Sequence, residues 1–213
     1  MTVLEAPETA RADGLDSGKR AQILEGARAV FLKRGFDAAS MGEIARQAGV
    51  SKGTLYVYFA SKEDLFGAIV QAQCPLQAEQ VFALDAEDHD VAGVLTRLGM
   101  QLASALCRVE RVSALRTIIA ISERMPEFGQ RFYEAGPATG IARLARYLEV
   151  QVAAGVLAID DPEVAASQFL ESCLATLLKP MLFGATAEPP GEPRIAHVVG
   201  MAVRTLMAAY GKR

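Results

Sequence analysis

The apolar residues of this chain recur every three or four positions over most of its length, which is the spacing of amphipathic α-helices. The first such segment is residues 19–34, which carries four apolar side chains on one face: Ile23, Ala27, Val30 and Phe31. Ser17 is a suitable N-cap for this helix, and Gly35 is a suitable end. Residues 1–17 are polar and lack this period, so we predict that they form a disordered tail.

Three shorter helices are predicted between residues 40 and 73. Each begins at a serine that can cap it by accepting a hydrogen bond from the backbone: Ser40, Ser51 and Ser61. Glu43, three residues after Ser40, completes the pattern of a capping box. Gly49 lies between the second and third helices of the chain, where a tight turn needs a residue in the left-handed conformation. Two short helices joined by such a turn form a helix-turn-helix, across which the first helix can pack.

The third helix, from Ser51 to about Tyr58, has an unusual outer face. Leu55 is expected to point inward, with Val50 and Phe59 on either side of it in the sequence. Its other faces carry a lysine, a glycine, a hydroxyl and two phenols: Lys52, Gly53, Thr54, Tyr56 and Tyr58. A helix that enters the major groove of DNA and meets phosphates can use all of these groups. The plain alternative is a three-helix bundle without a ligand, in which the two tyrosines help to close the core.

From about residue 90 onward, the apolar period predicts the longer helices of a second, larger domain. Helical patterns cover five further ranges: 90–109, 112–122, 126–155, 160–182 and 193–211. Gly136-Pro137 is expected to interrupt the third of these or divide it in two. The last two have broad apolar faces, so each can bury one side in its own domain and the other against a second subunit. A fully buried pair of core helices in a monomer is the alternative.

The composition is that of an ordinary globular protein, because 51% of its 213 residues are hydrophobic and 22% are charged. Three widely spaced cysteines, Cys74, Cys107 and Cys173, do not suggest a disulfide framework and are expected to act as small buried hydrophobes. The chain has neither the pattern of a signal peptide nor an uninterrupted apolar run of about twenty residues. We therefore predict a soluble cytoplasmic protein with no membrane partner.

Charge is unevenly distributed along the chain, whose formal net charge is −3. Residues 18–66 contain eight basic and five acidic residues, a net of +3, whereas residues 1–17 have a net of −3. One basic segment in an acidic protein is mild evidence for a polyanionic partner.

No enzyme motif is present, since the chain lacks a nucleophile elbow, a phosphate-binding glycine loop and a paired-histidine metal motif. We therefore predict no catalytic residue, no cofactor and no metal site. His89, in the acidic segment DAEDHD, is able to bind a cation, but its spacing matches no standard site. A solvated loop before a helix is the preferred interpretation of this segment.

The segment FLKRGFDAASMGEIARQAGVSKGTLYVYFASKEDL resembles the DNA-binding segment of the TetR family of bacterial transcriptional regulators. The resemblance covers roughly residues 19–66, with IA, AGVS, GTLYxYF and SKEDL in order and without a gap. It implies an all-α fold with a three-helix DNA-binding domain at residues 18–66. Residues 67–213 would then form a helical effector-binding and dimerisation domain.

The resemblance also implies which residues contact DNA: Ser40, Arg46, Ser51, Lys52, Gly53, Thr54, Tyr56, Tyr58 and Lys62. The hydroxyls of the serines and Thr54 would bind phosphates, and Gly53 would allow close approach of the backbone. Lys52 would reach a base edge or a phosphate, and Tyr56 would pack on a sugar or a thymine methyl group. Lys62 stands near a helix N-terminus, where the helix dipole disfavours a cation, and this mismatch favours a phosphate contact.

The middle helices of the second domain would enclose an effector pocket. The candidate lining residues are apolar: Leu98, Leu102, Leu115, Ile119, Phe132, Phe169 and Cys173. An apolar or aromatic effector is favoured because few charges fall on these faces. The same residues at the same period also describe an ordinary core. Residues 116–137 resemble the effector domains of a TetR subgroup linked to efflux control, which does not identify a ligand.

Together these features predict a homodimer, joined through the last two helices, that binds a palindromic operator in double-stranded DNA. A small-molecule effector would release it from the operator, most simply as a repressor. The alternatives are an effector-independent DNA-binding protein of chromosome organisation or division, and a helical enzyme that retains the fold. The operator sequence, the regulated genes, the effector and the number of dimers per operator stay open.

Overall fold

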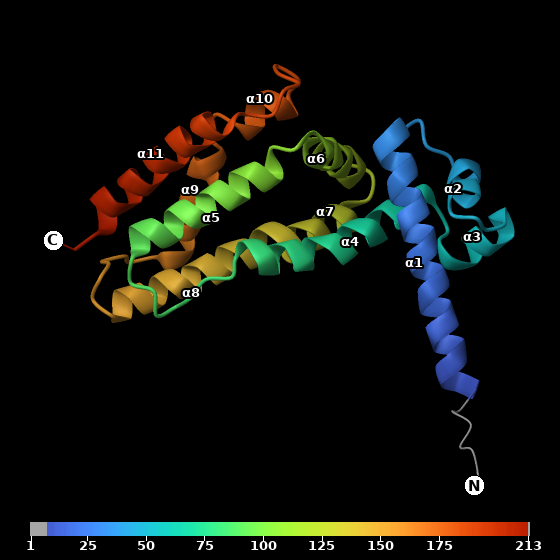
Figure 1. The fold of residues 1–213 in the computed structure, drawn as a ribbon, viewed down its shortest axis with the longest axis horizontal. Coiled ribbons are helices and arrows are strands. Elements are labelled where there is room, and N and C mark those ends of the chain that lie inside the picture. Colours follow the sequence, from blue (N-terminus) through green and yellow to red (C-terminus); the bar gives the residue numbers. More distant parts are fainter. Residues whose placement is uncertain (1–7, 213) are drawn as a thin grey trace, which may run out of the picture. The chain divides into compact units, whose positions relative to one another are not determined.

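A computed structural model of the chain describes residues 8–212, and describes side chains for all of these except residues 8–16 and 73–80. The described backbone is α-helical without a β-strand, which confirms the predicted fold class (Figure 1). Its helices follow in this order: α1 (Glu8–Arg34), α2 (Met41–Gln47), α3 (Lys52–Tyr58), α4 (Lys62–Val81), α5 (Val91–Leu106), α6 (Val109–Ser122), α7 (Pro126–Tyr133), the π-helical turn η1 (Glu134–Ala138), α8 (Thr139–Ala153), α9 (Pro162–Leu174), α10 (Leu178–Leu182) and α11 (Glu192–Tyr210).

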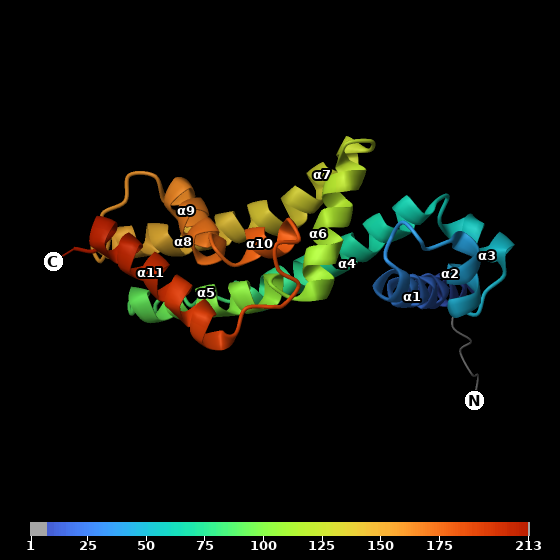
Figure 2. The same ribbon diagram turned by 90° about the horizontal axis from the view of Figure 1, so that it is seen from above.

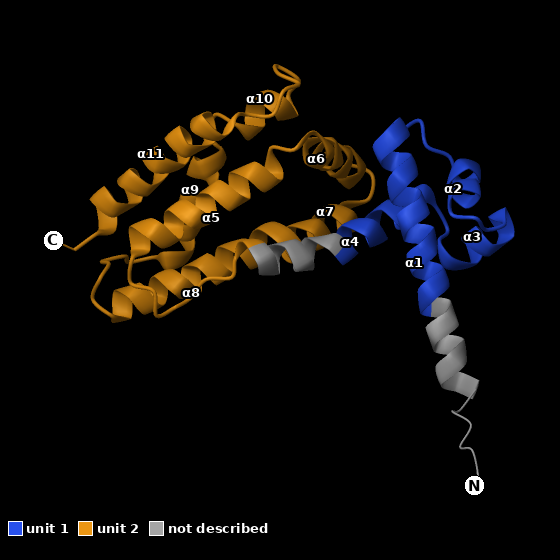
Figure 3. Ribbon diagram, in the orientation of Figure 1, with its two compact units in different colours: residues 1–72 blue, residues 73–213 orange. Residues whose placement is uncertain are grey.

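The chain separates into two compact units, residues 1–72 and residues 73–213 (Figure 3). The division falls within α4, slightly later than the boundary after residue 66 expected from the sequence. None of the helices in the described part of the chain is long and apolar enough to span a membrane.

Helix α1 begins at Glu8, earlier than predicted. The expectation of a disordered tail through residue 17 is therefore wrong for residues 8–17, and residues 1–7 lie outside the described residues. Ser17 lies within the helix and does not cap it. Apolar periodicity detects only the part of a helix that packs on a core. Extension of an existing helix by further turns needs no buried face, because propagation is far easier than nucleation.

The first unit is built around α1, which crosses the helix-turn-helix. Gly26 of α1 lies so close to Ala48 that a Cβ atom added at Gly26 would be 2.7 Å from the Ala48 Cα. Beside this contact, Gln22 Nε2 donates a hydrogen bond of 2.6 Å to the Ala48 carbonyl. The rings of Phe31, Phe36 and Phe66 pack together, with centroids 5.3 to 5.6 Å apart. These contacts hold α2 and its turn in a fixed place on α1.

The core of the second unit lies among α5, α8, α9 and α11. Helix α11 packs on both α5 and α9, and α9 packs on α8 (Figure 2). Gly99 of α5 brings these helices close together, since a Cβ there would be 2.7 Å from a methyl group of Val199 and 2.9 Å from the Cys173 sulfur. The predicted long helices are present, and one face of each of the last two is buried.

The acidic segment before α5 is attached to α8 by polar side chains. Gln151 is completely buried; its Nε2 donates to the Ala86 carbonyl and its Oε1 accepts from His89 Nδ1, both at 2.8 Å. The Tyr147 hydroxyl donates to the Asp88 carbonyl, and burial, together with nearby carboxylates, raises the pKa of Tyr147 to about 12. Asp85, Glu87, His89 and Asp90 are exposed, which agrees with a solvated loop before a helix, and His89 is in addition held by a buried amide 62 positions away in sequence.

The predicted interruption at Gly136-Pro137 is present as a π-helical turn. The backbone continues from α7 through η1 into α8, with Pro137 inside the turn (Figure 2). Proline lacks an N–H donor, which weakens the regular hydrogen-bond pattern at this point. The Thr139 hydroxyl donates to the Glu134 carbonyl at 2.8 Å and satisfies one acceptor there.

Candidate nucleic-acid interface

Both helices of the helix-turn-helix begin at the predicted serine caps. Ser40 Oγ accepts from the Glu43 N–H at 3.2 Å, and Ser51 Oγ accepts from the Thr54 N–H at 3.0 Å. Gly49 has φ of +65°, so the predicted left-handed turn is confirmed. The Glu43 carboxylate lies 3.2 Å from the Arg34 guanidinium group, which belongs to a different helix. This ion pair links the end of α1 to the first turn of α2.

The hydroxyls of Ser51 and Thr54 are 2.8 Å apart and share one hydrogen bond. Two hydroxyls carry two protons, and this bond uses one of them. One hydroxyl proton of the pair is therefore left to donate to an acceptor outside the protein. Since both residues lie at the solvent-facing start of α3, a phosphate oxygen is a suitable acceptor.

The outer side of α3 carries the polar groups that the sequence indicated, alongside the exposed Val57. Leu55 is completely buried, and Tyr56 is 54% exposed, so Tyr56 does not close the core. Tyr58 is half-buried and has an interaction with its surroundings. The phenol that projects into solvent is therefore that of Tyr56.

Lys52 lies across the first turn of α2. A Cβ atom added at Gly42 would be 2.8 Å from Lys52 Cε and 3.2 Å from its Nζ. Gly42 thus leaves room for the Lys52 side chain, which carries a positive charge over α2. Arg46, near the end of α2, has a side chain that is 79% exposed and 4.0 Å from Glu43. The two cations give the exposed surface of both helices a basic character.

Lys62 does not project as the helix-dipole reasoning implied. Its ammonium group donates to the carbonyls of Phe36 at 3.0 Å, Asp37 at 3.1 Å and Ala39 at 3.5 Å. It also lies 4.6 Å from the centre of the Phe36 ring. An ammonium group has three donors, and each of these carbonyls can take one. The mismatch between this cation and the start of α4 is therefore resolved inside the protein, without a phosphate.

Val57 was not identified as a candidate from the sequence. Among the side chains that the structure describes, no large apolar one is more exposed than Val57, at 84%. Helical geometry could have placed it outside, because a residue two positions from the inward-pointing Leu55 lies about 160° from it. An exposed valine has no group that binds a phosphate, so it does not stand out among the polar residues of α3.

The seven residues proposed to line an effector pocket lie in different environments. Four of them belong to the main core of the second unit: Leu98, Leu102, Phe169 and Cys173. Leu115 and Phe132 are half-buried. Ile119 is 58% exposed, so its expected inward position on α6 is wrong for this chain. Ile118 and Ile121 face the core in place of Ile119, so the buried face of α6 lies on a different side of the helix from the one expected.

The described cysteines behave as buried hydrophobes. Cys107 and Cys173 are buried free thiols, and burial raises the pKa of both, to about 12 for Cys173. A thiol needs to ionise to act as a nucleophile, so neither is suited to redox or catalytic chemistry. The side chain of Cys74 lies outside the described residues.

The fold and the surface of α2 and α3 define a helix-turn-helix DNA-binding protein. Residues 23–69 match the sequence profile of the tetR family of bacterial regulatory proteins. Residues 93–212, more than half of the chain, match a profile described as the C-terminal domain of AefR-like transcriptional repressors. The chain belongs to the TetR family of transcriptional regulators, and the resemblance noted in its sequence is confirmed.

Two solved structures resemble nearly the whole chain. A TetR-family transcriptional regulator from Mesorhizobium loti is 30% identical, with a TM-score of 0.84, over 97% of this chain and 100% of that chain. The Flavonoid-responsive Regulator FrrA is 33% identical, with a TM-score of 0.72, over 92% of this chain and 99% of that one.

Curated relatives match over shorter segments. The regulator TtgR of Pseudomonas putida is 31% identical over 101 residues, which is 47% of this chain and 48% of TtgR. The transcriptional activator FasR of Mycolicibacterium smegmatis is 51% identical over 53 residues, 25% of this chain and 24% of FasR. The chain thus spans about a quarter to a half of the length of these relatives.

Proposed function

We propose that this protein is a ligand-responsive repressor that binds a palindromic operator as a homodimer. The observation that carries this proposal is the outer face of α3, which presents a phenol, a hydroxyl pair and bare backbone on a helix packed against α2. Phosphate contacts are assigned to the Ser51–Thr54 pair, Ser40 and Tyr58, and base-edge or phosphate contacts to Lys52 and Arg46. Tyr56 would pack on a sugar or a thymine methyl group.

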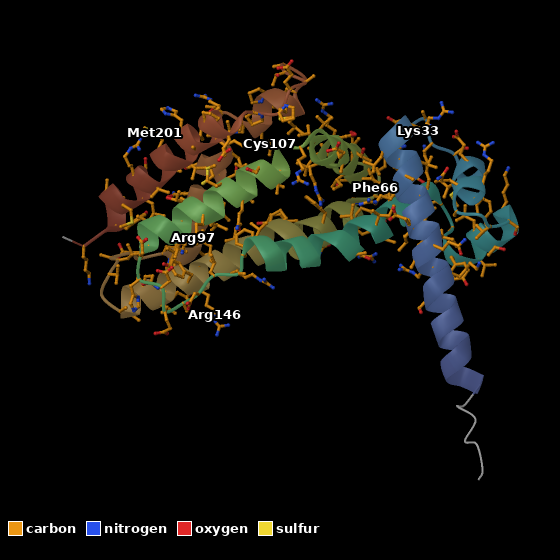
Figure 4. All side chains as sticks on the ribbon, viewed as in Figure 1. Lys33, Phe66, Arg97, Cys107, Arg146 and Met201 are labelled. Carbon is orange, nitrogen blue, oxygen red and sulfur yellow. The ribbon has the colours of Figure 1, made fainter. Side chains whose placement is uncertain are left out.

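The homodimer is proposed to form through α9 and α11. Each of these helices buries one side in its own unit. The exposed side of each is largely polar but carries one large apolar side chain. Val164 of α9 is 48% exposed. Met201 of α11, which Figure 4 labels, is 49% exposed. Ala208, seven positions after Met201, lies on the same side of α11 and is also exposed, and a small residue there allows a second helix to approach closely. A two-fold dimer would place two copies of α3 in successive major grooves, about 34–36 Å apart.

A repressor responsive to an apolar or aromatic effector agrees with two of the similarities. The profile that matches residues 93–212 is described as a repressor domain, and FrrA is named as flavonoid-responsive. FasR is an activator, but its similarity is confined to 53 residues. The effector would act by binding more tightly to the dimer that does not fit the operator, which shifts the population away from DNA. Membership of a regulator family makes the enzyme alternative unexpected.

The DNA-binding part of the proposal is tested by selecting duplexes from a random pool with the full-length protein, followed by fluorescence-anisotropy titration of the selected sequence at several salt concentrations. We expect a palindromic sequence that binds at least about a thousand times more tightly than unrelated DNA. Enrichment of no sequence would contradict the proposal, whereas enrichment of a single half-site would contradict the dimer.

Dimerisation is tested separately by analytical ultracentrifugation of Met201→Asp. We expect this variant to be monomeric and to lose operator affinity. Val109→Asp is the matched control, because Val109 is 50% exposed but lies on α6, at a first helical position that accepts an acidic residue. Equal behaviour of the two variants would exclude α11 from the interface.

The effector is sought by adding a panel of flavonoids and other apolar aromatic compounds to the preformed protein–DNA complex. Release of DNA by a compound that leaves the secondary structure intact is the expected result. A complex insensitive to the whole panel would favour effector-independent binding instead.

A further inference from the structure

The outermost strip of α3 consists of Gly53 and Val57. Successive residues of an α-helix turn by about 100°, so Gly53 and Val57, each two positions from Leu55, lie about 160° away from it on opposite sides. By the same geometry they are only about 40° apart from each other and point directly away from the buried face. Leu55 is 0% exposed and Val57 is 84% exposed, which agrees with this placement.

The fold itself explains neither residue. A Cβ atom added at Gly53 would meet only Ser51 Oγ, at 3.7 Å, which is an ordinary contact. Glycine inside a helix is unfavourable relative to alanine, so its presence here gives the free protein no benefit. Val57 is β-branched, which also disfavours a helix slightly, and it adds almost nothing to the core. Both choices become useful when another molecule approaches this strip.

The chemistry of the strip limits what it can recognise. Val57 has no hydrogen-bond donor or acceptor in its side chain and cannot bind a phosphate or the polar edge of a base. In the major groove, the C5 methyl group of thymine is the apolar group that a base pair presents. Gly53, one turn earlier, has no side chain, so the helix can lie deep in the major groove. The short isopropyl group of Val57 can then reach the thymine methyl group.

We propose that Val57 reads the methyl group of a thymine in each operator half-site, with Gly53 as the point of closest backbone approach. This inference rests on the proposed DNA-binding function and adds a specificity-determining residue to it. Val57 thus selects thymine over cytosine at one position, while the hydroxyls and cations around it fix the position of α3 on the phosphates.

The test replaces each thymine of the selected operator, one at a time, with deoxyuridine, which keeps base pairing and removes only the methyl group. For the natural protein we expect at least one thymine per half-site at which the substitution weakens binding about fourfold, the effect of losing one buried methyl group. In Val57→Ala the same substitution should change the affinity by less than about twofold, because little apolar contact is left to lose. Val57→Ala should fold normally, because alanine favours an exposed helical position.

Leu32→Ala is the matched control, since Leu32 is an exposed apolar residue of α1, at 54%. It should retain the full sensitivity to deoxyuridine. The inference is overturned if no thymine is sensitive, if every sensitive thymine stays sensitive in Val57→Ala, or if Val57→Ala weakens operator and random DNA equally. Failure to select any sequence from the random pool would instead refute the proposed function, so the two failures are distinguishable.

Discussion

Replacement of Lys62 by methionine tests whether Lys62 positions the helix-turn-helix or contacts a phosphate of the DNA. Methionine keeps an unbranched apolar side chain out to Cε but removes the ammonium group that donates to the carbonyls of Phe36, Asp37 and Ala39. These carbonyls lie in the segment between α1 and Ser40, the cap of α2. Lys62 therefore fastens the start of α4 to the loop that leads into the helix-turn-helix.

The size of the effect follows from these contacts. A hydrogen bond from a charged donor contributes about 1.5–3 kcal/mol when buried, and the contact with the Phe36 ring adds about 0.5–1 kcal/mol. Lys62 is half-buried, so water recovers part of this energy in the variant. We expect a net loss of about 2 kcal/mol, which lowers the melting temperature of a chain of this size by about 4–8 °C.

The assay combines thermal unfolding, followed by circular dichroism, with operator titrations over a range of salt concentrations. A lost phosphate contact would reduce the slope of log affinity against log salt by about 0.9 per subunit. A positioning residue should lower the affinity and leave this slope unchanged. Lys33→Met is the control, because it makes the same change of charge at an exposed lysine of α1 (Figure 4). An unchanged melting temperature together with a smaller slope would refute the positioning role.

Three further predictions concern glycines and a cysteine. Gly53→Ala should stabilise the free protein by about 0.5–1 kcal/mol in thermal melting, yet weaken operator binding at least about tenfold in anisotropy titrations. A loss of stability would show that the folded protein has no room for a Cβ atom at position 53, contrary to the structure. Gly26→Ala should destabilise the first unit by about 1–3 kcal/mol because the new methyl group would meet the Ala48 backbone, whereas Gly18→Ala, with nothing within 4 Å, should not. Cys173, with a pKa of about 12, should resist a thiol reagent at about pH 8 until urea unfolds the chain, and rapid labelling of the folded protein would refute its burial.

Local sequence signals predicted the helix-turn-helix well because its boundaries depend on interactions between near neighbours. Ser40 and Ser51 each bond an N–H three residues away, and Gly49 adopts the left-handed conformation that its own lack of a Cβ permits. The apolar period likewise identified Leu55 as buried. The interruption at Pro137 was visible in the sequence because proline acts on its own turn.

The apolar period was less reliable in segments without a capping residue, a glycine turn or a proline. It placed Ile119 on the inner side of α6, although Ile118 and Ile121 take that side and Ile119 is exposed. In a segment with apolar residues at several adjacent positions, more than one face satisfies a helical period, and packing selects between them. The beginning of α1 at Glu8 was missed for a related reason, since no buried face marks it.

The sequence alone determined the helical class, the two serine caps, the tight turn and the family, because each depends on residues within a few positions of one another. Only the tertiary structure decided the roles of Lys62 and His89. Lys62 acts on carbonyls 23 to 26 positions earlier, and His89 bonds an amide 62 positions later. Contacts between residues distant in sequence form only when the helices pack, so no local pattern encodes them.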